Sequence, residues 1–263
     1  MMMKYRFHPK AIEIYANAGW RLYPCAPGQK KPLIDNYYER ATNDVGQLMA
    51  WREKWPDANF ATVTGKSSGI VVLDIDAPYG FPALRAVEEA FAKLDTDSLI
   101  QATPNGGWHV IFRAPAEPLP SKPKLLGFGL ELRAERASIL LAPSIVNDTP
   151  YESYAWTLHE VERYIADPPP LPRWIIDLVN HAETTKPALG VVKAAREATV
   201  NGLTAFLTQQ REGNRNSALY WCAKRMYEGG FPISDAMLYL GIAARKTGLE
   251  DKEIERTIRS AYK

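Results

Sequence analysis

The segment 70–76, with the sequence IVVLDID, most constrains the fold of this chain, because it is β-branched, apolar and ends in acid. Side chains alternate across a strand, so Asp74 and Asp76 face one way while Ile75 faces the other. Two carboxylates on one face repel unless a cation or a proton neutralises them. Oxygen ligands of this kind suit Mg²⁺ or Mn²⁺. The alternative is that the two acids cap a turn, since Pro78 and Gly80 follow directly.

Composition excludes several classes of protein. The chain has 263 residues, 46% hydrophobic and 24% charged, which is typical of a globular protein. Its net charge of +2 shows no global basic field, although a basic groove fits within a balanced total. Two distant cysteines, Cys25 and Cys222, exclude a disulfide scaffold and a thiolate zinc site. Few cysteines and the lack of a signal peptide predict the cytoplasm, and no apolar run is long enough to span a bilayer.

Helix and strand signals mix without a regular βαβ alternation, which favours an α+β fold with a mixed sheet. Composition changes at the proline-rich stretch ADPPPLPRW, and helical periodicity dominates after it. We therefore expect a first domain over residues 1–170, a linker with a short helix over 171–190, and a small helical domain over 191–263. Predicted helices in the first domain are 8–19, 43–55 and 81–94, and predicted strands are 20–27, 60–64, 70–75, 99–103, 108–112, 130–133 and 139–145.

Thr64-Gly65-Lys66-Ser67 looks like the end of a phosphate-binding P-loop. That motif needs a glycine where Phe60 stands, and a helix rather than a strand should follow it. We therefore expect a turn between two strands.

Two further segments carry chemistry-bearing residues. Paired glycines, Gly106 and Gly107, allow a close backbone approach to a ligand, and His109 follows them at the start of a strand. The alternative is a hairpin turn with an ordinary half-buried histidine. In GLELR, Glu131 and Arg133 share one face of a strand, so Glu131 is a candidate third carboxylate and Arg133 a candidate phosphate partner. The alternative is a surface salt pair, which contributes little.

The order of these segments is more specific than any one of them: strand-Asp-x-Asp, Gly-Gly-x-His-strand, strand-acid-x-Arg, then a Pro-Ser turn. This order resembles the bifunctional DNA primase/polymerase family of the archaeo-eukaryotic primase superfamily. Supporting positions run from about Ala11 to Ser144, and they include Gly19-Trp20, Pro24, Lys31-Pro32, Trp51, Asn59 and Thr64-Gly65. The chain departs from the pattern in two ways: Glu131 replaces the usual Asp, and Asn105 and Gly107 stand where a small hydroxyl residue is often found.

The resemblance implies a primase-like α/β (α+β) catalytic core with a recognition-motif-like mixed sheet. It also implies template-directed, metal-dependent synthesis and extension of primers on single-stranded DNA from nucleoside triphosphates. Asp74, Asp76 and Glu131 would bind two divalent ions, Mg²⁺ or Mn²⁺. His109 would contact the triphosphate. The remaining expected nucleotide-binding residues are Gly106, Gly107, Arg133 and Lys31.

Within the predicted helical domain, a helix is expected to start at Arg211, and the REGNRN entry and the closing EIERTIRSAY resemble the module that follows such catalytic domains in phage and plasmid replication proteins. A replicative helicase, fused or separate, is the corresponding partner. Four basic residues are candidates for contacts with DNA phosphates: Arg211, Arg215, Lys224 and Arg225. A solvated helix face is the alternative for each of them.

Two other functions fit part of the sequence. A non-catalytic replication initiator that binds single-stranded DNA would explain the tail and the scattered aromatic residues, which can stack on bases. It would not explain three acids that converge with a Gly-Gly-x-His segment. A metal-dependent nuclease would use similar carboxylates.

Overall fold

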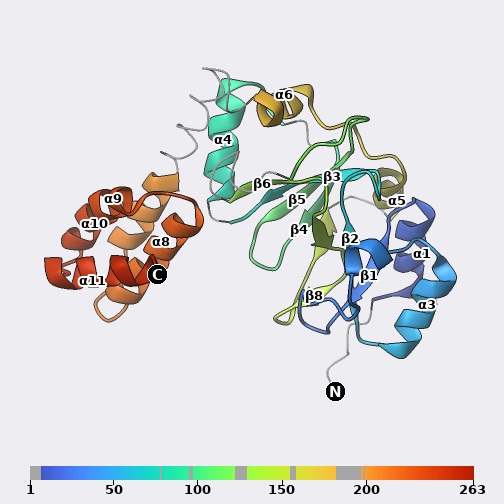
Figure 1. Cartoon of the computed structure of the whole chain (residues 1–263), viewed down its shortest axis with the longest axis horizontal. Coiled ribbons are helices and arrows are strands. Elements are labelled where there is room, and N and C mark those ends of the chain that lie inside the picture. The colour runs from blue at the N-terminus through green and yellow to red at the C-terminus, as the bar shows by residue number, and fades with distance from the viewer. Residues whose placement is uncertain are drawn as a thin grey trace.

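A computed structural model describes residues 7–77, 79–94, 97–121, 129–154, 158–181, 197 and 199–263 of the chain (Figure 1). Residues 7–181 form an α+β lobe, and residues 197–263 form a helical lobe that stands to one side of it. The expected change from mixed structure to helices is therefore present. Residues 182–190 of the predicted linker lie outside the described residues, so the domain boundaries stay predictions.

The larger sheet of the α+β lobe has five strands, and its central strand carries the acidic pair. The strand order is β10 (Glu152–Tyr154), β4 (Leu99–Ala102), β5 (Trp108–Arg113), β3 (Ile70–Ile75) and β6 (Leu130–Arg133). The α+β fold class is confirmed. The pairing differs from the mixed sheet that we expected, because every described pair of named strands is antiparallel. Parallel pairing is limited to isolated bridges such as Arg113 with Pro170.

A second sheet pairs β1 (Leu22–Cys25), β2 (Asn59–Val63) and β7 (Ser138–Leu140), and β8 (Ile145–Val146) forms a hairpin with β9 (Thr149–Pro150). The strand predicted over 139–145 is interrupted, because the Ala142 amide bonds to the Gln101 side chain and the Ser144 amide turns back to the Leu141 carbonyl. Residues 64–69 form the expected turn, closed by the Gly65 amide on the Ile70 carbonyl at 2.7 Å. The segment that resembles a P-loop is thus a connection between two strands.

The described part of the α+β lobe has six helices beside the sheets: α1 (Pro9–Asn17), α2 (Tyr37–Arg40), α3 (Val45–Lys54), α4 (Gly80–Ala90), α5 (Leu158–Ala166) and α6 (Arg173–His181). His8 and Asp44 cap α1 and α3 with side-chain acceptors, as N-cap residues do. Helix α4 is shorter than predicted, because the Leu94 amide bonds to the Glu88 carboxylate instead of continuing the helix. The sequence analysis did not predict α2 or α5.

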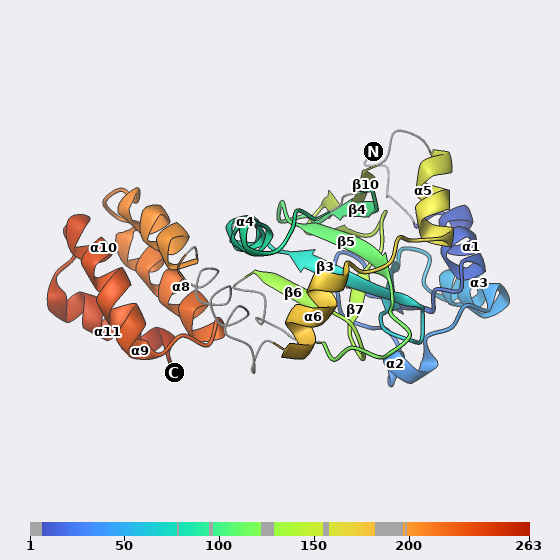
Figure 2. The same ribbon diagram turned by 90° about the horizontal axis from the view of Figure 1, so that it is seen from above.

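Both faces of β3 are buried at its first residues, and only its end reaches a cavity. Val71, Leu73 and Ile75 pack toward α4 and α6 in one core, while Ile70 and Val72 pack toward α1 and α3 in the other. Figure 2 shows α4 and α6 on one side of the sheet and α1 and α3 near the other end. Asp74 continues the Ile70–Val72 face beyond that second core. The strand thereby carries the Asp74 carboxylate into the interior, and Asp76 follows it at the exposed end.

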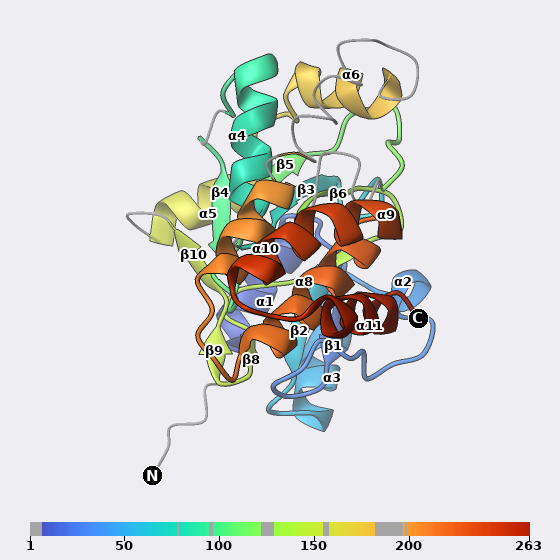
Figure 3. The same cartoon turned by 90° about the vertical axis from the view of Figure 1, so that its left-hand side faces the viewer.

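The helical lobe contains a helical segment at 199–208, then α8 (Arg215–Glu228), α9 (Ile233–Asp235), η1 (Ala236–Leu240), α10 (Gly241–Lys246) and α11 (Asp251–Ala261). Figure 3 looks onto this lobe. The helix expected from Arg211 begins later, at Arg215, because Gly213 has a φ of +92° and the chain turns there. Tyr79 of the α+β lobe belongs to the core of the helical lobe, and its ring lies 5.8 Å from that of Trp221. In the described part of the chain, the helices are too short or too polar to cross a membrane.

We predict that Gly80→Ala destabilises the protein by about 1 to 3 kcal/mol, because its new Cβ would collide with the Gly129 carbonyl oxygen and crowd Ile75. Gly46→Ala, in the first turn of α3, is the control, since only the flexible Asp44 carboxylate lies near its Cβ. That control should be neutral or stabilising by up to about 1 kcal/mol. Urea unfolding measures both variants, and equal effects would contradict the close contact at Gly80.

Candidate active site

A row of polar side chains crosses the five-stranded sheet. Gln101 of β4 pairs with His109 of β5, His109 pairs with Asp74 of β3, and Asp74 pairs with Glu131 of β6. Residues directly opposite each other in antiparallel strands project from the same face. The register therefore places three of the residues expected from the sequence side by side, and it adds Gln101, which the sequence analysis missed.

Asp74 and Asp76 line one cavity of about 400 Å³, so the prediction that they face the same way is confirmed. One side of this acid-lined cavity is cationic, because Lys30 and Arg133 also line it together with His109. The remaining lining residues are Gly28, Gln29, Thr103, Pro104, Asn105, Val146, Asn147 and Tyr151. A site that places carboxylates beside cations suits a ligand that carries both a metal ion and phosphates.

Arg133 bridges two of the acids. Its Nη2 lies 3.0 Å from Asp74 Oδ2 and 3.0 Å from Glu131 Oε2, and its Nε donates to Asp74 Oδ2 at 3.1 Å. The salt pair that the sequence suggested as the alternative for GLELR therefore exists. The pair is part of a larger ion cluster, because Arg133 also bonds to Asp74. The Asp74 side chain is only 8% exposed, so this cluster lies inside the site and not on the surface.

The other oxygen of Asp74 has no hydrogen-bond partner. Asp74 Oδ1 is buried, and His109 Nε2 lies 3.6 Å from it. Burial raises the pKa of Asp74, and the neighbouring Arg133 guanidinium lowers it only in part. Burial and the charge of Asp74 together raise the pKa of Asp76. An unpaired buried carboxylate oxygen beside a second acid is a place where a cation would be stabilised.

The third predicted carboxylate, Glu131, does not line the acid-lined cavity. Glu131 lines a neighbouring cavity of about 450 Å³, where Asp76 also appears. Within the described ranges, no three acidic, histidine or cysteine side chains gather closely enough to hold a metal ion. Asp74 and Asp76 fit a divalent cation by their donor atoms and by the orphaned Oδ1, whereas Glu131 is held by Arg133.

His109 is buried rather than half-buried, with 5% of its surface exposed. Burial, together with the nearby Lys30 and Arg133 charges, lowers its pKa to about 3. Its imidazole is therefore neutral at ordinary pH, and it can donate from one ring nitrogen and accept at the other.

The paired glycines shape the turn before β5. Gly106 has a φ of +78°, and a Cβ on Gly107 would collide with the Ile75 carbonyl oxygen. The Gly107 amide donates to Thr103 Oγ1 at 3.1 Å. Both glycines allow the turn to lie against the end of β3, and Asn105 of the same turn lines the acid-lined cavity.

Lys30 is a site residue that the sequence analysis missed, since Lys31 was the predicted phosphate partner. Lys30 lines the acid-lined cavity. Burial raises the pKa of the nearby Tyr151 hydroxyl, and the Lys30 charge lowers that pKa in part. Lys31, although exposed like Lys30, does not line the cavity. The two lysines are adjacent in a loop, so no periodicity in the sequence distinguishes them. The sequence signal for a phosphate-binding residue here is the pair of adjacent lysines in the Gly28–Pro32 loop, and it does not say which lysine faces the cavity.

The helical lobe contributes to the 450 Å³ cavity through α8. Trp221, Arg225 and Glu228 line it opposite Asp76, Tyr79 and Glu131, together with Ala77, Asn105 and Gly129. The Arg225 guanidinium lies 5.3 Å from the Trp221 ring and 3.2 Å from Glu228. We call this space the interlobe cavity. Its position makes Asp76 and Asn105 common to both cavities.

One of the four predicted basic residues of the tail lines the interlobe cavity. Arg225 reaches the interlobe cavity, whereas Arg211, Arg215 and Lys224 are not among its lining residues. Lys224 lies over the Tyr227 ring at 4.7 Å, and Arg215 lies 4.0 Å from Glu212.

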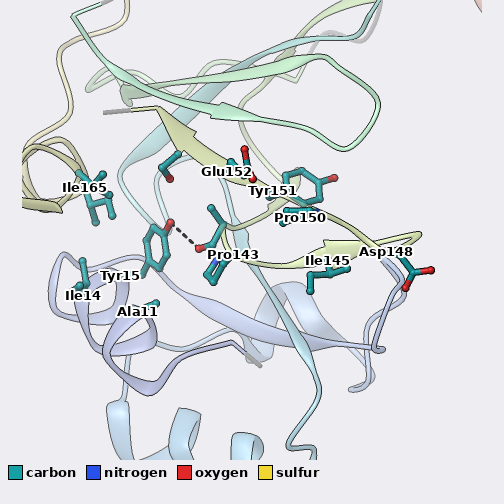
Figure 4. Close-up of a pocket in the computed structure, with 13 residues that line it drawn as sticks. Ala11, Ile14, Tyr15, Pro143, Ile145, Asp148, Pro150, Tyr151, Glu152 and Ile165 are labelled. Atoms are coloured by element: carbon teal, nitrogen blue, oxygen red, sulfur yellow. Dashed lines mark hydrogen bonds between the residues drawn. The ribbon is translucent and has the colours of Figure 1, made fainter. Parts of the chain in front are cut away.

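A larger cavity of about 580 Å³ lies away from the acidic pair (Figure 4). Residues of the segment 142–153 form most of its walls, residues of α1 and α5 complete them, and the Tyr15 hydroxyl donates to the Ala142 carbonyl. Neither Asp74 nor Asp76 lines it. The chemistry of the site therefore belongs to the smaller, charged cavities.

We predict that His109 makes the protein less stable in acid. An unfolded histidine with a pKa near 6.5 takes up a proton at pH 5 that native His109 does not, so stability falls as pH drops below 6.5. This residue should account for about 2 kcal/mol of the unfolding free energy lost between pH 8 and pH 5. Urea unfolding of the wild type and His109→Gln at both pH values isolates the effect, because Asp74 and Asp76 are present in both proteins. Equal losses of unfolding free energy in the wild type and His109→Gln would contradict the assignment of this pH dependence to His109.

A solved structure titled "Crystal structure of primase RepB'" is similar to this chain at 13% identity, and the match covers 96% of this chain and 93% of that one. The TM-score of the superposition is 0.34. A search among curated proteins finds no match.

The family described as "Bifunctional DNA primase/polymerase, N-terminal" matches residues 11–174, which is more than half of the chain. The matched segment contains the acidic pair, His109, Glu131 and Arg133. The chain therefore belongs to the bifunctional DNA primase/polymerase family.

Proposed function

We propose that this protein synthesises and extends primers on a single-stranded DNA template from nucleoside triphosphates, with Mg²⁺ or Mn²⁺, in phage or plasmid replication. The family is one of DNA primases and polymerases, so a DNA-directed nucleotidyltransferase is the general activity. The observation that carries the proposal is Asp74 Oδ1, which is buried and without a hydrogen bond to the described residues, beside Asp76 in a cavity that Lys30, His109 and Arg133 also line. A replicative helicase, fused or separate, belongs to the same proposal.

Asp74 and Asp76 would hold the divalent ions of the reaction. Bound there, such ions would activate the attacking hydroxyl and neutralise the triphosphate. Asp74 is preorganised by the register of β3 with β5 and β6 and is held in place by Arg133, and the Asp76 amide is tied to the Gly129 carbonyl. Glu131 is the remaining candidate ligand, and it lies one strand away opposite Asp74.

The cationic side of the acid-lined cavity would bind the triphosphate. Lys30 and Arg133 supply positive charge, and His109 supplies a neutral hydrogen bond. Lys31 and the turn formed by Gly106 and Gly107 would support the phosphates from the edge of this cavity. Catalysis would consist mainly of positioning and charge neutralisation, as in other phosphoryl transfers.

The interlobe cavity would serve initiation. Starting a primer requires two free nucleotides and a bare template to be held together without a duplex, so ordering costs more than in extension. The interlobe cavity adjoins Asp76, and it offers the Trp221 ring for stacking and the Arg225 guanidinium for a phosphate. Arg211, Arg215 and Lys224 would contact template phosphates outside it.

Two other functions make different predictions for one experiment. A labelled primer on a single-stranded template, incubated with nucleotides and Mn²⁺, is extended by a polymerase and shortened by a nuclease. An initiator that only binds DNA leaves the primer unchanged. Extension that disappears with a metal chelator supports the proposal, and either of the other outcomes overturns it.

We predict that Asp76→Asn lowers nucleotide incorporation at least about a hundredfold, because a carboxylate ligand of the metal is lost. Its melting temperature should hold or rise, since the repulsion that raises the pKa of Asp76 is relieved. Asp148→Asn is the matched control, because Asp148 is an exposed turn residue that does not line either charged cavity. Extension by purified Asp76→Asn at the wild-type rate would contradict the metal assignment.

We also predict that Arg225→Ala lowers primer synthesis from free nucleotides about tenfold, because a charge-assisted contact at the interlobe cavity is lost. Extension of a primer that is already annealed should change less than about threefold, because the duplex holds the 3′ end. Arg259→Ala is the control, since Arg259 pairs with Glu255 on α11 much as Arg225 pairs with Glu228 on α8. Equal losses in both assays would contradict a role in initiation.

A further inference from the structure

Gln101 is a fully buried polar side chain in the middle of the site. Its Nε2 lies 2.8 Å from the Leu140 carbonyl oxygen and 3.0 Å from His109 Nδ1, and its Oε1 lies 2.6 Å from the Ala142 amide nitrogen. All three distances are those of hydrogen bonds. The side chain joins β4, the end of β7 and the ring of His109.

Two backbone groups fix which end of the Gln101 amide faces which way. The Ala142 N–H can be accepted only by the amide oxygen, and the Leu140 carbonyl can accept only from the amide nitrogen. Both contacts give the same orientation. The second N–H of the Gln101 amide therefore points at His109 Nδ1.

This orientation fixes the tautomer of His109. Nδ1 must accept from Gln101, so it carries no proton, and the single proton of the neutral ring is on Nε2. Nε2 lies on the side of Asp74, 3.6 Å from its unpaired Oδ1, and His109 lines the acid-lined cavity. The ring thus presents a donor to that cavity, where the other tautomer would present a lone pair.

We propose that Gln101 is a positioning residue that holds His109 as the Nε2–H tautomer, so that His109 donates to an anionic phosphate group and does not coordinate the metal. The part of this proposal in which His109 donates to a phosphate group rests on the proposed function. A metal-bound imidazole needs the lone pair of Nε2 and a proton on Nδ1, and the Gln101 amide cannot accept that proton. The same network opposes a metal-ligand role for His109 and favours a phosphate-binding role.

Nitrogen NMR of protein labelled with ¹⁵N only in histidine tests the tautomer without nucleotide or metal. The chain has four histidines, and His109→Gln identifies the signal that belongs to His109. At neutral pH we expect Nε2 to resonate as a protonated ring nitrogen and Nδ1 as an unprotonated one. A protonated Nδ1 on His109 in the wild type would overturn the proposal, and this measurement needs no variant of Gln101.

Variants of Gln101 test the functional consequence. Gln101→Glu keeps an oxygen for the Ala142 amide but turns the donor that faces Nδ1 into an acceptor, so the His109 proton should move to Nδ1. The KM for nucleotide should rise about ten- to hundredfold, the value of one hydrogen bond to a charged group, while the Kd for single-stranded DNA stays within about twofold. Gln101→Met removes the donor without adding an acceptor. Its KM for nucleotide should lie between that of the wild type and that of Gln101→Glu.

Gln47→Glu, an exposed position on α3, controls for the added charge. A folded Gln101→Glu that keeps the wild-type nitrogen pattern, or that raises nucleotide KM and DNA Kd equally, would overturn the proposal. A wild-type protein that shows the expected tautomer but incorporates no nucleotide would defeat the proposed function alone. The two failures are therefore distinguishable.

Discussion

The register of β3 between β5 and β6 is the constraint on which the rest of this structure depends. It places Asp74 opposite both His109 and Glu131, while the alternate residues of the same strand fill the core under α4 and α6. A slip of one residue would send the carboxylates into that apolar core and the leucine into the charged cavity. The same hydrophobic burial that fixes the sheet thus fixes the geometry of the site.

The arrangement of the acidic side chains lowers the free energy of unfolding of the protein. Asp74 has one oxygen on Arg133 and one without a partner, and Asp76 lies beside it in the same cavity. The raised pKa values of both carboxyl groups express that cost, since each would be relieved by a proton or a cation. Arg133 limits the cost by bridging Asp74 to Glu131, which lets the strand end stay folded with its charges close together.

The sequence predicted the local features well and the long-range ones poorly. Strands β3 and β6 match their predicted bounds, because β-branched or alternating apolar residues define them, and the shared face of Asp74 and Asp76 follows from the two-residue period. Gln101 was missed because its partners lie 8, 39 and 41 residues away. The choice between Lys30 and Lys31 depends on the path of a loop, which no periodicity encodes.

Tyr79 lies three residues after Asp76 and ends in the core of the helical lobe, against Trp221 and close to Gly202. The α+β lobe therefore supplies part of its neighbour's hydrophobic interior from the loop that follows the acidic pair. A helical module taken from a related protein could replace this one only if it kept a pocket for the Tyr79 ring. A mismatched module would leave an empty hole in its own core and strain the loop that positions Asp76. Sequence changes at Tyr79, Gly202 and Trp221 should accordingly occur together during divergence.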